Sequence, residues 1–506
     1  AARICWEEYP KPVDPFHPNN PLMIFAGALT GSRAPYAGRA SICAFSPQGY
    51  PHGWFTRSTI GGHFGAELKR AGYDGLIVTG QADEPLHLRI RDDEVSLQPA
   101  RELWGLDALD TLEALAAQDG RCVRGLAIGP AGERLSRIAT IQTASSSASG
   151  QGGFGAVMGA KNLKAISVVG SGKVSLAEPD RVGALARALA RLLADEKPAG
   201  LEAFGGDIEA LNRRLAAAGD GQAAVRACTE SCITPCTPYF RGVPGSGCDR
   251  EWQGSWACVG QMFRGSHEAE PGLRETGYDW ELARRAAFEL HLLSNRYGLN
   301  QFDLLMGMVP WLRASQKAGL INSFNGREMD WRSPAFWLEF LEAIAYRSGM
   351  GDTLAEGGWA AAQALELGLE QVQRRYPAWG HAANFDGHAG GYLPFPYWLV
   401  SALQWMADTR DPFGSGHGYG WAFSAAERAA AVEDAAERDA ALDLIRSIGQ
   451  RVYGSPDSVD PFGGYRDKAA AAVFQTRRAV LRVCLPLCSI VFPLIYRAHV
   501  PGHWCK

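Results

Sequence analysis

Three glycine-rich segments near the beginning of this chain, Ala26–Gly31, Gly61–Leu68 and Gly150–Gly155, constrain its fold more than any other feature. Glycine lacks a Cβ atom, so the backbone there can pass close to another group or adopt a positive φ. The 59 Gly and 28 Pro among 506 residues exceed the usual share of about 12%. Three such loops in one domain predict a large bound ligand, with ordinary turns as the alternative. A dinucleotide-binding fold is disfavoured, because the Ser- and Ala-rich stretch 143–149 is not the hydrophobic strand that its glycine motif follows.

The hydrophobic pattern changes along the chain. Up to about residue 174, short apolar runs bounded by Gly predict strands, for example Leu22–Phe25, Leu76–Val78 and Ile166–Val169. From Pro179 onward, apolar residues recur at helical spacing, as they do again around 282–293 and 425–448. We therefore expect an α+β protein. Its three predicted domains are a β-rich domain at 1–174, a helical domain containing a cysteine cluster at 175–376, and a second helical domain at 377–506.

Charge and cysteine usage exclude several classes of protein. The net charge is −4 and the pI is about 6.3, and no basic run is long enough to follow a nucleic acid backbone. The longest apolar stretches are shorter than the roughly 20 residues that span a bilayer. Eleven cysteines, an odd number, argue against a secreted disulfide framework. We predict a soluble, cytoplasmic protein without nucleic acid or membrane partners, and we expect one or both chain ends to be missing.

The cysteines most suggestive of chemistry are Cys228, Cys232 and Cys236, which form C-x3-C-x3-C. Cys484 or Cys488, far downstream, could supply a fourth thiolate. Three close cysteines and one remote cysteine are a common way to bind an iron-sulfur cluster. Zinc is less favoured because its ligands usually come in two C-x2-4-C pairs, and small buried hydrophobic residues are the remaining alternative. Pro235 and Pro238 predict a loop rather than a continuous helix around this motif.

Several longer motifs make the chain resemble the tungsten- or molybdenum-containing aldehyde:ferredoxin oxidoreductase family over nearly its whole length. The matching segments are Leu29–Gly31 with Gly38-Arg39, Gly61–Lys69 with Ala71–Asp74, Ile128–Glu133, Gly152–Gly159 with Lys161–Ile166, Asn295–Asn300 and Gly351–Gly357.

This resemblance implies that the β-rich first domain cradles pterins and that two mainly helical domains complete the pocket. It implies a tungsten or molybdenum bis-pterin centre, a nearby [4Fe-4S] cluster and an ion such as Mg²⁺ bridging the pterin phosphates. Residues at the motif positions would contact the phosphates or the bridging ion: Arg39, Thr59, Gly61, Ala148 and Gly150. Others would hold the pterin rings: Asn295, Leu299, Asn300, Arg410 and Leu487.

The chain departs from the family pattern in three places. One more residue separates Cys228 from Cys232 than is usual in the family. Asn295 and Asn300 stand where the first pterin motif usually has Asp, and Asn can still accept hydrogen bonds. The second pterin motif reads Val483–Cys488 and keeps only Leu487 and Cys488, so Val483 replaces an acceptor with an apolar side chain. The resemblance implies Cys488 as the fourth cluster ligand.

Two residues are candidates for acid-base chemistry. The family's active-site Glu aligns with Gln253 or with Glu251, and only Glu251 can accept a proton usefully. His417 resembles the family's active-site His, with a loop histidine as the alternative.

The leading hypothesis is an enzyme that oxidises aldehydes to carboxylic acids and passes electrons through the cluster to ferredoxin or another low-potential carrier. A second is an aromatic acyl-CoA ring reductase of the same fold. A third is a non-catalytic electron-transfer or scaffold subunit that keeps the cluster, supported by Val483 and Gln253 and opposed by Arg39 and the glycine loops. Monomer and homodimer are both open.

Overall fold

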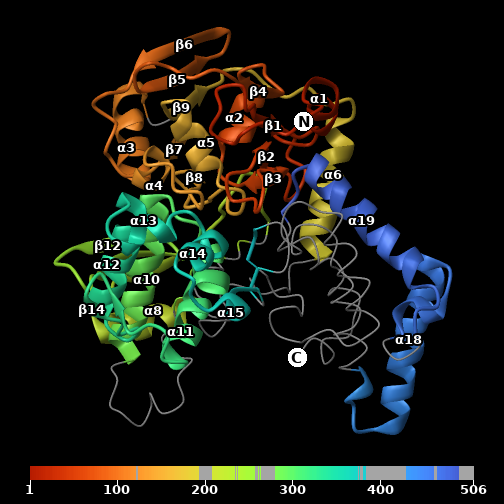
Figure 1. Cartoon of the computed structure of the whole chain (residues 1–506). Helices are drawn as coiled ribbons and strands as arrows, with labels where there is room; N and C mark the ends of the chain where they lie inside the picture. Colours follow the sequence, from red (N-terminus) through yellow and green to blue (C-terminus); the bar gives the residue numbers. More distant parts are fainter. Residues whose placement is uncertain are drawn as a thin grey trace.

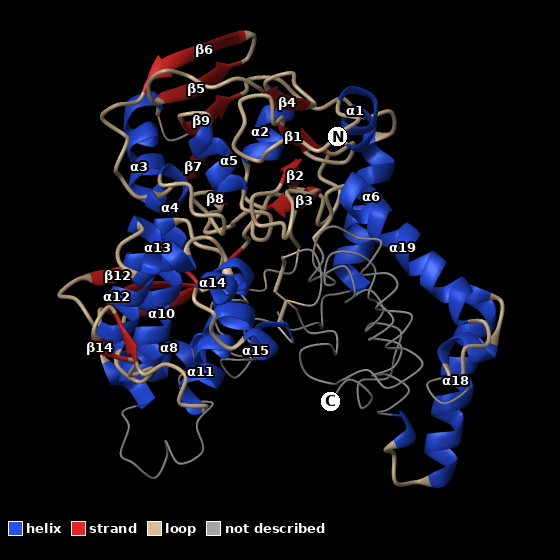
Figure 2. Cartoon of the chain, in the orientation of Figure 1, coloured by secondary structure: helices blue, strands red, loops and turns tan. Residues whose placement is uncertain are grey.

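The computed structural model describes residues 1–120, 123–192, 208–233, 235, 237–256, 260, 263, 280–373, 375–376, 380–382, 429–460 and 464–488. The first part of the chain lies at the top of Figure 1, a helical part lies below it, and the last described helices run along one side. Figure 2 shows that most strands belong to the first part and most helices to the rest. The predicted α+β class is confirmed.

The first part contains two sheets. The four-stranded sheet has the order β3-β2-β1-β4 and is antiparallel throughout. The five-stranded sheet has the order β6-β5-β9-β7-β8, and β5 and β9 are its parallel pair. The strands are β1 (Leu22–Ala26), β2 (Ala40–Phe45), β3 (Phe55–Ile60), β4 (Gly75–Val78), β5 (Leu86–Arg91), β6 (Glu94–Pro99), β7 (Arg124–Ile128), β8 (Ile141–Gln142) and β9 (Leu163–Val169).

One hydrophobic core joins the two sheets through helices α2 (Phe64–Arg70) and α5 (Phe154–Ala160). Both helices are short, and nearly every side chain of α5 is buried. Glycine permits this density, because a Cβ at Gly159 would lie 2.0 Å from the carbonyl oxygen of Gly132. The remaining helices of this part are α1 (Ala2–Glu8), α3 (Ala108–Asp119) and α4 (Pro130–Glu133).

The middle of the chain is mainly helical but also carries a small antiparallel sheet with the order β10-β11-β12. Its core is rich in aromatic side chains, with Trp331, Phe336 and Phe340 in edge or tilted contacts. The elements are α6 (Pro179–Leu192), α8 (Ile208–Ala218), β10 (Gln222–Arg226), β11 (Thr237–Pro244), β12 (Glu251–Ser255), α10 (Trp280–Tyr297), the π-helix η1 (Asp303–Met308), α11 (Val309–Lys317), β13 (Ser323–Phe324), β14 (Arg327–Glu328), α12 (Pro334–Tyr346), α13 (Met350–Leu354), α14 (Gly358–Ala364) and α15 (Leu369–Gln373).

The last described part returns the chain to the first sheet. It consists of α18 (Ala435–Tyr453), the 3-10 helix η3 (Pro456–Val459) and α19 (Lys468–Cys484). Ser41 Oγ on β2 donates to the carbonyl oxygen of Val483 at 3.0 Å. A Cβ at Gly27 would lie 2.2 Å from the ring of Pro486, so glycine is needed where this segment meets the sheet. Residues near 30 and near 485 are therefore neighbours (Figure 1).

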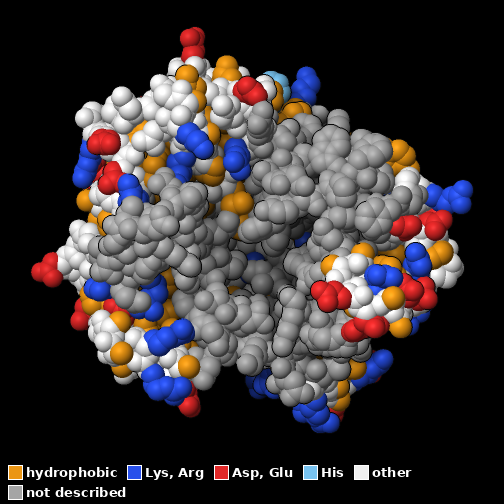
Figure 3. Space-filling model, turned by 90° about the horizontal axis from the view of Figure 1, so that it is seen from below, with side chains coloured by type: hydrophobic (Ala, Val, Ile, Leu, Met, Phe, Trp, Pro, Cys, Tyr) orange, Lys and Arg blue, Asp and Glu red, His pale blue; other side chains and the backbone are white. Residues whose placement is uncertain are grey.

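Among the described residues, no helix combines the length and the apolar character needed to cross a membrane. On the face drawn in Figure 3, described acidic and basic side chains are interspersed. This mixture agrees with the small net charge of the sequence.

Candidate functional site

Arg39 and Thr59 lie together on one face of the first sheet. Arg39 precedes β2, and its guanidinium NH1 donates to Thr59 Oγ1 at 3.3 Å. Thr59 pairs with Ser41 across β2 and β3, so all three residues share this end of the sheet. Ser41 on the same face also contacts the last turn of α19, through the carbonyl oxygen of Val483. Two residues predicted to contact a phosphate or its ion are thus brought together.

The start of the cysteine segment is attached to the Gly61-Gly62 loop. Gly62 N donates to the Cys228 carbonyl oxygen at 2.8 Å, and Thr229 Oγ1 donates back to the Gly62 carbonyl oxygen at 2.8 Å. Ser145 Oγ donates to the same Cys228 oxygen at 3.0 Å. The glycine-rich segment Gly61–Leu68 thus meets the cysteine segment directly, and the side chain of Ser145 contacts the same carbonyl oxygen.

Cys232 and Cys488 approach each other although 256 positions separate them in the sequence. Tyr36 N donates to the Ser231 carbonyl oxygen, and Cys488 N donates to the Tyr36 carbonyl oxygen, both at 3.0 Å. Cys232 and the buried Cys488 pack in one small cluster with Tyr36. Cys484, by contrast, is exposed at the end of α19. The main chain of Tyr36 therefore links the cysteine loop directly to the remote cysteine.

The structure describes three of the four predicted cysteine ligands, Cys228, Cys232 and Cys488. Cys236 lies outside the described residues. Within the described ranges, no three His, Cys, Asp or Glu side chains are grouped closely enough to hold a metal ion. Cys228 and Cys232 do lie in a loop between β10 and β11 rather than in a helix, as Pro235 and Pro238 led us to expect.

The Gly150–Gly153 turn begins the third glycine-rich segment, and three of its residues have positive φ: Gly150 (62°), Gly152 (117°) and Gly153 (67°). Gln48 fixes the turn by accepting from Gly152 N at 2.7 Å, and Ser46 Oγ donates to the Gly152 carbonyl oxygen at 2.8 Å. The predicted residue Ala148 forms an antiparallel bridge with Gln142.

The space around the glycines differs from one position to the next. At Gly38, Gly61 and Gly153, a Cβ would lie within 2.5 Å of another protein atom, so these glycines serve chain packing. At Gly150, the Ser58 hydroxyl at 3.8 Å is the nearest atom that a Cβ would meet. The glycine pattern therefore marks close packing at three of these positions, whereas a Cβ at Gly150 would make only ordinary van der Waals contact.

The buried polar atoms of the first part that have no hydrogen-bond partner among the described residues include Thr56 Oγ1, Ser58 Oγ, Gln142 Oε1 and Gln151 Nε2. Their side chains are at most 2% exposed. Buried polar groups are nearly always paired, so each such atom calls for an explanation. Ser58 Oγ lies 3.8 Å from the position that a Cβ on Gly150 would occupy, and Gln151 follows Gly150 in the sequence. This grouping fits a ligand rich in hydrogen-bond acceptors at the turn.

Asn300 reaches the same turn, whereas Asn295 does not. Asn300 Nδ2 donates to Gln151 Oε1 at 2.7 Å, and Asn300 N donates to the Ile138 carbonyl oxygen. Leu299 is buried in an antiparallel bridge with Ala139. Asn295 is buried in a separate group, where its Oδ1 accepts from Gln301 Nε2 at 3.0 Å.

Sequence reasoning missed Asp303, the first residue of the π-helix η1. It is fully buried, accepts from Gln48 Nε2 and Tyr376 OH at 2.8 Å each, and thereby joins η1 to the Gly150–Gly153 turn. Burial raises the pKa of Asp303 to about 6, although both hydrogen bonds act against the rise. π-helices occur often at functional sites. The available signal was a lone carboxylate within the apolar run 302–306.

The two predicted acid-base residues are not placed together by the described structure. Glu251 begins β12 and its side chain is exposed, as is that of Gln253. Glu251 is therefore not in the buried environment that favours a carboxyl general base. His417 and Arg410 lie outside the described residues. Leu487 is half-buried one position before Cys488.

The glycine-rich loops and the cysteines both lie in regions of the chain that match models of a known protein family. Family models of the aldehyde ferredoxin oxidoreductase N-terminal domain and of its domains 2 and 3 match residues 1–170 and 223–502. The chain belongs to the aldehyde ferredoxin oxidoreductase family. Both models include residues of the site described above, Arg39 and Gly150 in the first and Cys232 and Cys488 in the second.

Relatives of this chain carry names that refer to different substrates. The tungsten-containing aldehyde ferredoxin oxidoreductase of Pyrococcus furiosus is 29% identical over 78% of this chain and 66% of its own length. The chain thus spans just under two thirds of that relative. The WOR-like subunit of an aliphatic sulfonate oxidoreductase from the same organism is 36% identical over 33% of this chain and 29% of its own.

A solved structure shares the fold. It is the BamBC active-site complex of benzoyl coenzyme A reductase, with a TM-score of 0.66 and 20% identity. The match covers 95% of this chain and 84% of that chain. At this identity the likeness shows a shared fold, and the family assignment rests on the two family models.

Proposed function

We propose that this chain oxidises aldehydes to carboxylic acids at a tungsten or molybdenum centre held by two pterins. The bound metal supplies the two-electron chemistry by which an aldehyde and water become an acid with release of two protons. The two electrons would leave singly through a [4Fe-4S] cluster to ferredoxin or another low-potential carrier.

The observation that carries this proposal is the approach of Cys488 to the cysteine loop. The backbone of Tyr36 bonds to Ser231, the residue before Cys232, and to Cys488 itself. Three clustered thiolates and one remote thiolate suit a cubane cluster. Cys228, Cys232, Cys236 and Cys488 are accordingly the proposed ligands.

The proposed pterin contacts surround this loop. Arg39 would bind phosphate oxygen, since a guanidinium suits anionic oxygen, and Thr59, bonded to Arg39, would bind phosphate or its bridging Mg²⁺. Gly61, Ala148 and Gly150 would contribute backbone groups on the same side. Leu299 and Asn300 would contact a pterin ring, with Asn295, Arg410 and Leu487 as further candidates from the family motifs.

Proton transfer needs a group near the reacting carbon, and His417 is the proposed candidate. Glu251 was the other sequence candidate, but its exposed side chain gives it less support. Water exclusion would come from the buried polar and apolar groups around Gly150–Gly153.

A comparison of two cysteine variants tests this function. Cys488→Ser should abolish the visible absorbance of the cluster and aldehyde-dependent viologen reduction by anaerobically purified protein. Cys484→Ser is the matched control, because Cys484 is exposed only four residues away, and it should retain both signals. Equal behaviour of the two variants would contradict the proposed ligand set.

The same assay distinguishes the alternatives. Turnover of aliphatic or aromatic aldehydes supports aldehyde oxidation. Reduction of an aromatic acyl-CoA without aldehyde turnover would favour a ring reductase, and a cluster without tungsten, molybdenum or any turnover would favour an electron-transfer subunit.

A further inference from the structure

We propose that the exposed face of α6, together with the loop around Arg33, is the docking surface for a small acidic iron-sulfur electron carrier. The side chains that define this surface are Arg33, Lys173, Arg187 and Arg191, which we call the basic rim; all four are exposed. The inference rests on the proposed function, because it requires electrons to leave through a cluster bound by the cysteine loop. It adds the place where the carrier binds and the chemistry that holds it.

Helix α6 contacts the cysteine site with one face only. Its Leu189 packs in the small cluster that contains Cys232 and Cys488. Arg187 and Arg191 each lie two positions from Leu189, which is about 200° around an α-helix. They therefore lie on the opposite face, which points away from the cysteines. The helix that packs on the proposed cluster ligands thus presents positive charge to solvent.

Arg33 and Lys173 bring two further positive charges to the same region. The segment that leads from β9 to α6 passes close to the loop around Arg33, since a Cβ at Gly31 would lie 2.8 Å from Val174 Cγ2. Arg33 lies three residues before Tyr36, whose backbone bonds to both parts of the cysteine site. Both basic residues therefore belong to segments that border this site.

Neighbouring acids do not balance the basic rim. Among the described residues, none of its four side chains forms an ion pair. By contrast, Arg70 pairs with Glu230 of the cysteine loop. At the start of α6, Arg181 pairs with Glu178 at 3.1 Å, and Asp180 is a further acid there. The rim is therefore a local excess of positive charge on a chain whose net charge is −4.

The dipole of α6 explains only part of this excess. A basic residue in the last turn of a helix is stabilised by the dipole, and Arg191 is such a residue. Arg187 precedes it by four positions, a spacing at which like charges repel each other. Arg33 and Lys173 lie outside helices. A partner with negative charge would relieve the repulsion within the rim.

An electron carrier with an acidic surface fits this position. Cys228 and Cys232 are only half-buried, so a cluster that they bind would lie near the surface. Electron-transfer complexes bury little area and are transient, and complementary charges bring such partners together and orient them. A carrier with acidic side chains around its own cluster would therefore be held with that cluster facing the cysteine loop.

The test measures the binding of a fluorescently labelled, acidic two-cluster ferredoxin to the anaerobically purified full chain by anisotropy. The variant Arg187→Glu with Arg191→Glu reverses two charges of the rim. We expect it to raise the Kd at low salt by about tenfold or more. The difference should disappear near 1 M salt, where charges are screened beyond roughly 3 Å. Arg187→Gln with Arg191→Gln should raise the Kd less.

Arg446→Glu with Arg451→Glu is the matched control. Both arginines are exposed on α18, which lies well away from α6 in Figure 1, and this variant changes the net charge by the same amount. It should bind the ferredoxin with the wild-type Kd. A basic c-type cytochrome is the second probe, and the α6 variant should bind it more tightly than wild type does. That opposite response separates lost charge complementarity from lost structure.

The outcomes distinguish this inference from the proposed function. Wild-type ferredoxin affinity in the α6 variant, an equal loss in both glutamate variants, or no binding by wild type would overturn the docking surface. Aldehyde-dependent reduction of methyl viologen, a small cation, is measured on the same proteins and should be unchanged in the α6 variant. If wild type bound the ferredoxin at the rim but showed no viologen reduction with any aldehyde, the proposed function would fail and the docking surface would remain.

Discussion

At the scale of single residues, Asp303 is a fully buried carboxyl group whose pKa is raised to about 6 by burial. The ordinary value is 3.8, so the folded state favours the protonated form. The stability contributed by this preference is complete below the unfolded pKa and is lost as the pH rises through 6.

We expect Asp303→Asn to remove this pH dependence. Asn can accept from Gln48 and donate to Tyr376, so the network is kept without the buried charge. Above pH 7 the variant should be more stable than wild type by about 1–3 kcal/mol, and below pH 4 the difference should disappear. Chemical unfolding followed between pH 4 and 8 measures this, and parallel curves for the two proteins would contradict the assignment.

The sequence predicted some of these residues and could not predict others. Arg39 and Thr59 were named from motifs and do form a hydrogen bond. The choice of Cys488 over Cys484 as the fourth ligand stays a prediction, although burial and the contact with Tyr36 support it. Asp303 was missed, because its partners Gln48 and Tyr376 are far away in sequence and periodicity carries no information about them.

At the scale of elements, the cysteine loop lies against the first sheet because Gly38 has no side chain. A Cβ there would lie 2.4 Å from both the Glu230 carbonyl oxygen and Thr229 Oγ1. Gly38→Ala should therefore displace the loop and reduce bound iron to less than half of the wild-type amount.

Gly183→Ala is the control for this substitution. Gly183 lies in α6, and a Cβ there would meet only the end of the Arg187 side chain at 3.3 Å. Alanine favours helix by up to about 1 kcal/mol over glycine, so iron content should be unchanged. Full iron content in Gly38→Ala, measured by plasma mass spectrometry, would show that the close contact is not required.

Element types were predictable where one short pattern decided them. The runs 22–25, 76–78 and 166–169 lie in β1, β4 and β9, and the Pro179 helix is α6. The small sheet β10-β11-β12 was not predicted, because its strands are short and mix exposed and buried positions irregularly. In β5, the buried residues are His87, which contacts Ser167 at 2.7 Å, and Ile90, so this strand does not bury a single alternating face.

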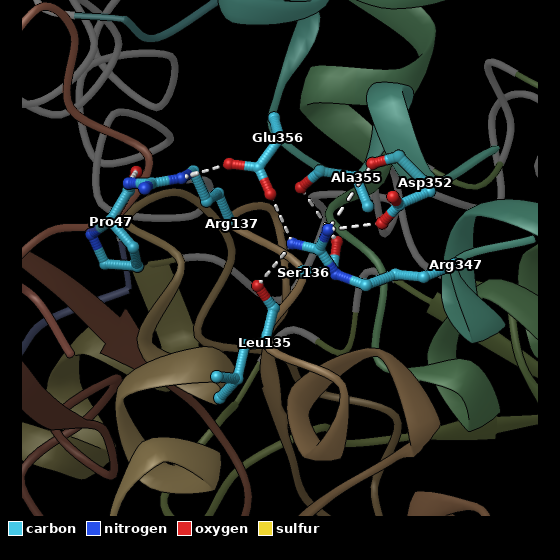
Figure 4. Close-up of polar contacts among 8 residues, drawn as sticks. All are labelled: Pro47, Leu135, Ser136, Arg137, Arg347, Asp352, Ala355 and Glu356. Carbon is cyan, nitrogen blue, oxygen red and sulfur yellow. Dashed lines mark hydrogen bonds and ion pairs between the residues drawn. The ribbon is translucent and has the colours of Figure 1, made fainter. Parts of the chain in front are cut away.

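At the scale of the whole molecule, an ion-pair network fixes the first part of the chain to the helical part (Figure 4). Glu356 accepts from Arg137 Nε at 2.6 Å and from Arg347 NH2 at 2.5 Å. Arg347 NH2 also donates to the Leu135 carbonyl oxygen at 2.9 Å. Burial alone would raise the pKa of Glu356, but the two guanidinium groups outweigh it and lower that pKa.

We expect Glu356→Ala to destabilise the protein by about 1–2 kcal/mol near neutral pH, since the group is partly exposed and its ion pairs are screened by water. A double-mutant cycle with Arg137→Ala should give a coupling of about 0.5–1 kcal/mol. The effect should shrink as the pH falls below the ordinary carboxyl value of 4.5, because the stabilising charge is lost there. Strictly additive losses would indicate that the two side chains do not interact across the junction.

The metal content of anaerobically purified full-length chain tests the central claim most directly. The proposed cofactors require about four iron atoms and one tungsten or molybdenum atom per chain. Plasma mass spectrometry normalised to protein by amino-acid analysis should return that ratio for wild type. Iron without the heavier metal, or neither metal, from cells supplied with tungstate and molybdate would contradict it.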